Sequence, residues 1–324
     1  MQRIKLVSAI AASGLIVLAA GAAGAQNVKV TALGSHAGEF CRSDRAMMFE
    51  DPDGTTLLYD VGRTVAGADD PRLGKVDVVL LSGVHNDHIG DKRMAAPGAG
   101  TCAKPKADVP ATPNTNTAEI AAAKKAKIIV GGEIRSFLQP KITAAGGSAK
   151  QVDVLRHGGK RKVGGVTIAV VAAIHSNGVS PGLLASDLGG HLKAEGLNAA
   201  VGPENGYVLT FSNGLAVYLS GDTGHTSDMA TIVNGYYKAN LAVVAIGDIY
   251  TMGPEEAAFA VNVLLKPAAV IPTHANEVAT QGGKLQDGTK TAKFVSLVKG
   301  IPVYLPLSGV VMEFDGNAKC VAGC

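Results

Sequence analysis

The chain has 324 residues, a formal net charge of +3 and an aromatic content of only 4%. This near-neutral balance gives no electrostatic basis for binding nucleic acid or an anionic membrane. The length allows one large domain or two smaller ones, and without tryptophan the core must be built from valine, leucine, isoleucine and alanine.

The first 25 residues have the pattern of a secretory signal peptide. Arg3 and Lys5 precede an almost wholly apolar stretch, residues 6–20, and small residues then lead to Ala25. We expect cleavage after Ala25, which lowers the net charge from +3 to +1 and leaves residues 26–324 as a single domain. The apolar stretch is short for a membrane span, so we expect a secreted or periplasmic protein without membrane attachment in its mature form.

Four cysteines lie in the mature part of the chain. An even count in an exported protein favours disulfides over zinc ligation. Cys320 and Cys324 are close enough to pair, which leaves Cys41 for Cys102, although the spacing also permits the crossed pairings.

The first half of the chain reads as strands followed by strand and helix alternation. The β-rich runs and helical stretches, in order, are a strand at 28–33, a hairpin of 46–49 with 55–59, a buried strand at 76–81, a short helix from Ile89, a surface excursion at 97–117, a helix at 118–126, a strand at 127–130, a helix at 133–145 and a strand at 152–155. The continuous apolar run at 76–81 is typical of a central strand covered on both faces.

The second half repeats this organisation. It is expected to contain a hairpin within 163–174, a glycine-rich excursion at 176–202, a hairpin of 207–211 with 215–219, a strand at 241–246, a helix at 254–265, a strand at 268–271, a helix at 291–298 and strands near 301–304 and 310–314. Two similar β-rich layers with helices outside them follow from this order.

Histidine and aspartate side chains appear where β-rich runs end. His85, Asp87 and His88 follow the run that ends at Leu81, and the same context recurs at three later points: His175, Asp222 and His274. Imidazole nitrogens and carboxylate oxygens are natural metal ligands, and loops at one edge of a sheet converge in space. Each isolated histidine can instead be structural, and Asp222 can be a turn residue before Gly224, but their joint recurrence favours a metal centre.

The order of these motifs resembles the metallo-β-lactamase fold hydrolases. It comprises Gly83-x-His85-x-Asp87-His88, His175, Ser220-Gly221-Asp222-Thr223-Gly224 and His274. Two further stretches, residues 247–257 and Ile271-Pro272-Thr273-His274, are similar to the branch that contains the ascorbate-6-phosphate lactonase. The resemblance implies an αββα four-layer sandwich with a one- or two-metal site at the edge of the two sheets.

By this resemblance, site one takes Gly83, His85 and His175, site two takes Asp87, His88 and His274, and Asp222 bridges them. Glycine offers no side chain where the family usually has a histidine. We therefore expect one zinc ion in site two, with site one empty or weakly filled, and manganese or iron as alternatives.

The expected chemistry is hydrolysis of a small ester, lactone or amide by a metal-activated water, with Asp87 or Asp222 as the base. Family members that hydrolyse β-lactams usually have cysteine or serine in place of Asp222, so that activity is the alternative. A second alternative is a catalytically degenerate member that binds a metal or ligand, with Gly83 marking the loss.

Three other residues are candidates for contact with the small-molecule substrate. His225 lies three residues after Asp222, and His36 lies in a turn that can border the pocket, although either can simply be a solvated or turn-capping histidine. Gly83 can also widen the pocket for a bulkier substrate.

Overall fold

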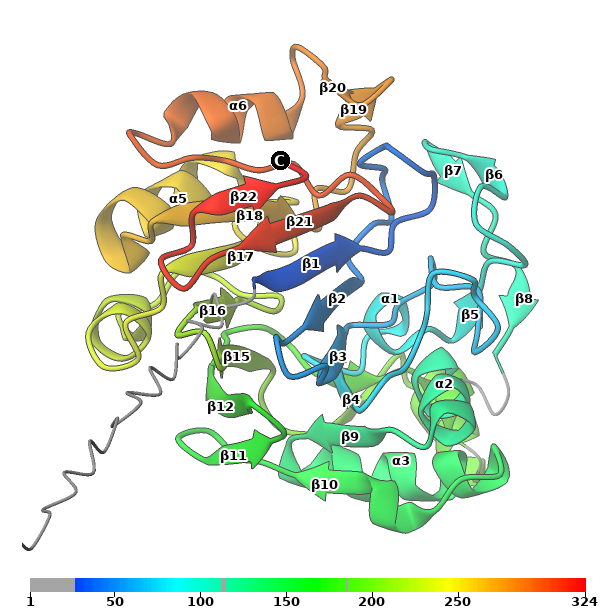
Figure 1. Ribbon diagram of the computed structural model, residues 1–324. Helices are drawn as coiled ribbons and strands as arrows, with labels where there is room; N and C mark the ends of the chain where they lie inside the picture. The colour runs from blue at the N-terminus through cyan, green and yellow to red at the C-terminus, as the bar shows by residue number, and fades with distance from the viewer. Residues whose placement is uncertain (1–26, 112–114, 185) are drawn as a thin grey trace, which may run out of the picture.

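The computed structural model describes residues 27–111, 115–184 and 186–324, so the expected leader lies outside the described residues. Within them, two β-sheets carry most of the fold (Figure 1). The larger sheet has eight strands in the spatial order β10 (Val152–Val154), β9 (Lys127–Val130), β4 (Val78–Leu80), β3 (Thr56–Tyr59), β2 (Met47–Glu50), β1 (Val28–Ala32), β21 (Val311–Phe314) and β22 (Cys320–Ala322). The smaller sheet has six, in the order β11 (Lys160–Val163), β12 (Val166–Ala172), β15 (Asn205–Thr210), β16 (Ala216–Leu219), β17 (Leu241–Ala245) and β18 (Ala269–Thr273).

Helices cover the outer faces of both sheets. Figure 1 shows α5 (Pro254–Phe259) and α6 (Lys290–Leu297) beside the smaller sheet, and α2 (Asn116–Lys124) and α3 (Gly132–Ala144) beside β9 and β10 of the larger one. The other helical segments are α1 (Asn86–Ile89), α4 (Asp187–Ala194), the 3-10 turns at Ala149–Gln151 and Pro181–Leu183, and the π-helical segments at Met229–Asn234 and Ala260–Leu265. Short hairpins pair β5 (Lys92–Arg93) with β8 (Val109–Pro110), β6 (Gly100–Thr101) with β7 (Lys104–Pro105), β13 (Gly178–Val179) with β14 (Ala199–Ala200), and β19 (Thr280–Gln281) with β20 (Lys284–Leu285).

Successive side chains along each strand point to opposite faces of the sheet, and the apolar ones form three layers. In β4, Val78 and Leu80 face the layer between the two sheets, while Val79 faces the layer beneath α2 and α3. The third layer lies between the smaller sheet and helices α5 and α6, where Phe294 is fully buried. The fold is therefore the expected αββα sandwich.

Parallel pairing aligns the strand ends that matter for the site. Strand β4 is parallel to β3 and β9, and β17 is parallel to β16 and β18, whereas the hairpin strands are antiparallel. The carboxyl ends of parallel neighbours meet at one edge of a sheet, so the loops after β3 and β4, and those after β16 and β18, are brought together.

The prediction that a helix begins at Ile89 is wrong. Helix α1 instead ends at Ile89, because Gly90 adopts a left-handed conformation (φ +69°) and its backbone N–H bonds back to the Asn86 carbonyl. The excursion at 97–117 contains short hairpin strands, and Thr115 caps α2 within it. No helix among the described residues has the length and apolar character of a membrane span.

Cys41 pairs with Cys102, and Cys320 pairs with Cys324. The first bond ties the loop before β2 to the hairpin of β6 and β7, so the surface excursion is held to the body of the protein.

Tyr207 ties the two sheets together beneath the strand ends. It is fully buried on β15, and its hydroxyl lies 2.7 Å from the Leu81 carbonyl and 3.2 Å from the Ile129 carbonyl of the opposite sheet. We expect Tyr207→Phe to lower the free energy of unfolding by about 1–3 kcal/mol, because it leaves buried carbonyl groups without their donor. Urea denaturation measures this change. Tyr236→Phe, at a site with 67% of the side chain exposed, should change stability by less than about 0.5 kcal/mol; equal effects of the two substitutions would contradict the prediction.

Candidate metal centre

Six of the predicted residues come together in two groups of potential ligands. The first group contains His85, His175 and Asp222, and the second contains Asp87, His88 and His274; within each group, one donor atom per residue lies within 4.8 Å of the others. The division is the one expected from the sequence. The loops that carry them are joined by backbone contacts, since the Gly224 N–H donates to the Ile174 carbonyl and the Ile174 N–H donates to the Thr223 hydroxyl.

His88 and Asp222 form the buried centre of the site. His88 Nε2 lies 3.0 Å from Asp222 Oδ2, and His88 Nδ1 lies 2.9 Å from Asp60 Oδ2. Although burial opposes it, the Asp222 and Asp60 carboxylates raise the pKa of His88 to about 10. Burial likewise favours the neutral form of Asp222, but His88 overcomes this and holds the pKa of Asp222 well below its usual value.

The other three histidines are held in the neutral form that binds metal ions. Burial, followed by the neighbouring Arg45 guanidinium, lowers the pKa of His274 to about 3. Burial, together with His88 and His175, lowers the pKa of His85 to about 4, and burial also lowers that of His175. His274 Nε2 lies 3.4 Å from Asp222 Oδ1 and 3.5 Å from Asp87 Oδ2, so it faces both carboxylates.

Three residues of the site were missed by the sequence reasoning: Asp60, Arg45 and Glu204. Asp60 follows β3 directly, in the strand-end context that singled out the other ligands, and it has a left-handed backbone (φ +43°). Arg45 is buried and forms an ion pair with Asp87, from a loop position that carries no such signal. Glu204 is fully buried immediately before β15, and burial raises the pKa of its carboxyl to about 8.

A divalent metal ion fits this donor set. Several buried polar atoms of the site have no hydrogen-bond partner among the described residues: Asp222 Oδ1, both ring nitrogens of His274 and both carboxylate oxygens of Glu204. Buried polar groups are nearly always satisfied, so such a cluster indicates a missing ligand. Imidazole and carboxylate donors are those that zinc and related divalent ions accept.

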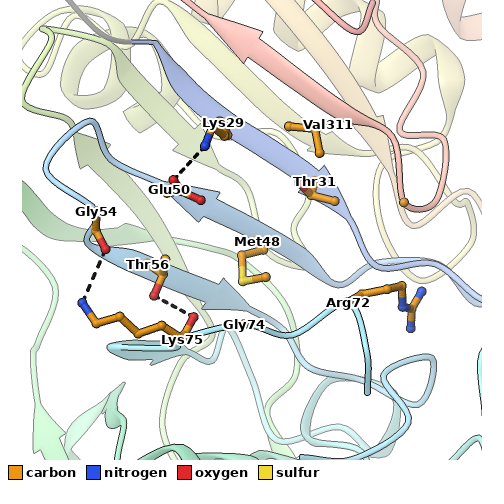
Figure 2. Close-up of a pocket in the computed structure, with 11 residues that line it drawn as sticks. Lys29, Thr31, Met48, Glu50, Gly54, Thr56, Arg72, Gly74, Lys75 and Val311 are labelled. Carbon is orange, nitrogen blue, oxygen red and sulfur yellow. Dashed lines mark hydrogen bonds and ion pairs between the residues drawn. The ribbon is translucent and has the colours of Figure 1, made fainter. Parts of the chain in front are cut away.

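A cavity of about 560 Å³ opens directly on the ligands. It is lined by Arg42, His85, Asp87, His175, Ser176, Asp222, Gly247, Asp248, Tyr250, His274, Asn276 and Lys290. A separate cavity of the same volume lies on the outer face of β1, β2 and β3, where Lys29 pairs with Glu50 (Figure 2). None of the six candidate ligands lines that second cavity.

The structure does not bring His225 or His36 to the site cavity. His225 is exposed and packs edge to face against Phe259, with ring centroids 5.7 Å apart. His36 Nδ1 lies 3.1 Å from the Ser35 hydroxyl, and its Nε2 lies 3.4 Å from the Gly100 carbonyl. Both side chains are therefore engaged elsewhere. Gly83 does not widen the cavity either, because the Glu204 carboxylate fills the space beside it.

Comparison with known proteins extends over most of the chain. A family model described as the β-lactamase superfamily domain matches residues 44–274. A UPF0173 metal-dependent hydrolase of Koribacter versatilis is 31% identical over 237 residues, covering 72% of this chain and 82% of that protein. Its counterpart in Thermococcus onnurineus is 31% identical over 252 residues, covering 77% and 85%.

Solved structures have the same fold. Igni18, a metallo hydrolase of Ignicoccus hospitalis, superposes with a TM-score of 0.56 at 25% identity, covering 89% of this chain and all of that one. An isothiocyanate hydrolase from Delia radicum gut bacteria gives a TM-score of 0.52 at 20% identity, with coverage of 89% and 99%. At that identity the second likeness shows the fold alone.

An αββα sandwich with histidine and aspartate side chains at the shared sheet edge is the arrangement expected of the metallo-β-lactamase fold hydrolases. The matches place the chain within that class. It belongs to the β-lactamase superfamily and, within it, to the UPF0173 metal-dependent hydrolases. The family expected from the motifs is thereby confirmed.

Proposed function

We propose that the protein is an exported, zinc-dependent hydrolase of a small ester, lactone or amide. The observation that carries the proposal is the position of Asp222, which belongs to the first ligand group and also contacts His88 and His274 of the second. An aspartate at this position favours lactone and ester chemistry over β-lactam hydrolysis, where cysteine or serine is usual. The leader-like residues 1–25 support export.

The protein's side chains would position the reaction at this edge. A metal ion held by these groups would supply an activated water at neutral pH and would polarise the substrate carbonyl. Asp60 fixes His88 through its Nδ1, so that Nε2 faces the centre. Arg45 pairs with Asp87 at the mouth of the site, where the carboxylate is 35% exposed and is placed to act as a general base.

Charged side chains around the cavity restrict the substrate. Arg42 is exposed and lines the cavity, and Lys290 lines it while donating to the Gly247 carbonyl. A substrate that carries an acidic group beside its reactive carbonyl would place that group near these cations.

Chelation and substrate panels test the proposed function. We expect hydrolysis of lactones and esters, with faster turnover of carboxylate-bearing members, little turnover of β-lactams, loss of activity after chelation and its recovery on adding Zn²⁺. The intact mass of the exported protein should correspond to a chain that begins at Gln26. Activity that survives complete removal of metal, or a panel in which only β-lactams react, would overturn the proposal.

A further inference from the structure

Glu204 occupies the space that a side chain at position 83 would need. A Cβ built on Gly83 would lie 1.9 Å from Glu204 Oε1 and 2.1 Å from Oε2, which no real structure tolerates. A side chain at position 83 is therefore compatible with this structure only if the Glu204 carboxylate moves away. The two residues are 121 positions apart in sequence, on opposite sheets, so the arrangement is tertiary.

The backbone around Glu204 is fixed from several directions. The Asn205 N–H donates to the Ser82 carbonyl at 2.8 Å, and the Asn177 side chain bridges the Val84 N–H and the Pro203 carbonyl. His157 Nε2 lies 3.0 Å from the Glu204 carbonyl oxygen. These contacts lock the segment that carries Glu204 against the loop that carries Gly83 and His85.

The Glu204 carboxylate is completely buried, and neither oxygen has a hydrogen-bond partner among the residues described. His85 Nδ1 lies 4.0 Å from Glu204 Oε1. A buried carboxylate without a partner is costly, and burial is tolerated when the group is paired or coordinates a metal. The first ligand group has three donors, which with one water complete the coordination of a catalytic zinc ion. The Glu204 carboxylate does not lie within 4.8 Å of all three donors, so it has to move towards them to bind the same ion.

We propose that Glu204 is a fourth protein ligand of the first metal group, in place of the side chain that Gly83 lacks. The group then consists of two histidines, His85 and His175, and two carboxylates, Glu204 and Asp222. The expectation of a single ion rested on an incomplete first site, so the protein should instead bind two ions per chain. The inference rests on the metal-binding part of the proposed function and is independent of the substrate.

Metal content, measured without any assay of turnover, tests this inference. Purified protein is stripped by chelation, titrated with Zn²⁺, desalted and analysed for zinc by mass spectrometry. We expect two ions per chain in the native protein. Glu204→Gln keeps the shape of the side chain and should retain one ion, with the affinity for the second lowered by at least about 100-fold. Glu195→Gln, at an exposed glutamate, should retain both ions.

An exchange of residues separates ligand loss from damage to the fold. Gly83→His alone should lower the melting temperature and should not increase zinc content, because its side chain collides with Glu204. Gly83→His/Glu204→Ala removes the collision and supplies an imidazole, so it should bind two ions again. Two ions at native affinity in Glu204→Gln would overturn the inference. One ion in both the native protein and Glu204→Gln would also overturn it, and a failure of the substrate panel would leave it intact.

Discussion

Asp222→Ala is expected to lower kcat/KM by at least about 1,000-fold and to reduce the zinc content of the protein. Asp222 belongs to the first ligand group and also contacts two histidines of the second: its Oδ2 lies 3.0 Å from His88 Nε2 and its Oδ1 lies 3.4 Å from His274 Nε2. Metal-ion catalysis contributes several kcal/mol of transition-state stabilisation, and each 1.36 kcal/mol corresponds to a tenfold change in rate. Removal of the shared carboxylate weakens both groups at once.

The measurement pairs steady-state kinetics on the best ester or lactone with zinc analysis of the same preparation. Asp69→Ala, at an exposed aspartate, is the matched control and should leave both values unchanged. Circular dichroism checks that Asp222→Ala remains folded, since Asp222 is buried. A folded Asp222→Ala protein that keeps its zinc and more than a tenth of its activity would show that Asp222 is not the shared ligand.

The clustering of the candidate ligands could be predicted because it depends on a local pattern. Each candidate ligand follows a β-rich run, and parallel strands deliver such residues to one edge of a sheet. The same pattern holds for Asp60 after β3, so this residue was accessible to sequence reasoning. The family resemblance then supplied the division into two groups.

Glu204 and Arg45 could not be predicted in the same way. Glu204 follows a glycine-rich excursion. Its position beside Gly83 depends on how the two sheets pack, and the spacing of residues in the sequence gives no information about that packing. Arg45 lies just before β2, in a stretch whose sequence is that of an ordinary charged loop. Only the fold brings it into contact with Asp87. The helix expected at Ile89 was wrong for a local reason, because Gly90 ends α1.

Asp60 is expected to act as a positioning residue for His88. It is buried, it accepts hydrogen bonds from the Ser82 N–H at 2.9 Å and the Ser82 hydroxyl at 2.7 Å, and it lies 2.9 Å from His88 Nδ1. Carboxylates that orient a ligating histidine typically contribute 10–100-fold to metal affinity. We therefore expect Asp60→Asn to weaken zinc binding by the second group by about 10–100-fold, with activity restored at high zinc concentration.

Recovery by excess zinc distinguishes positioning from a purely structural role. Asp77→Asn is the matched control, because Asp77 precedes β4 and accepts from the Thr56 N–H at 2.9 Å, at the other end of β3 from the site. It should lower stability without changing zinc affinity. If Asp60→Asn binds zinc as tightly as the native protein, or if its lost activity does not return with added zinc, Asp60 does not position His88. If zinc affinity falls for Asp60→Asn and not for Asp77→Asn, the end of β3 belongs to the metal centre, together with the four strand ends that carry the candidate ligands.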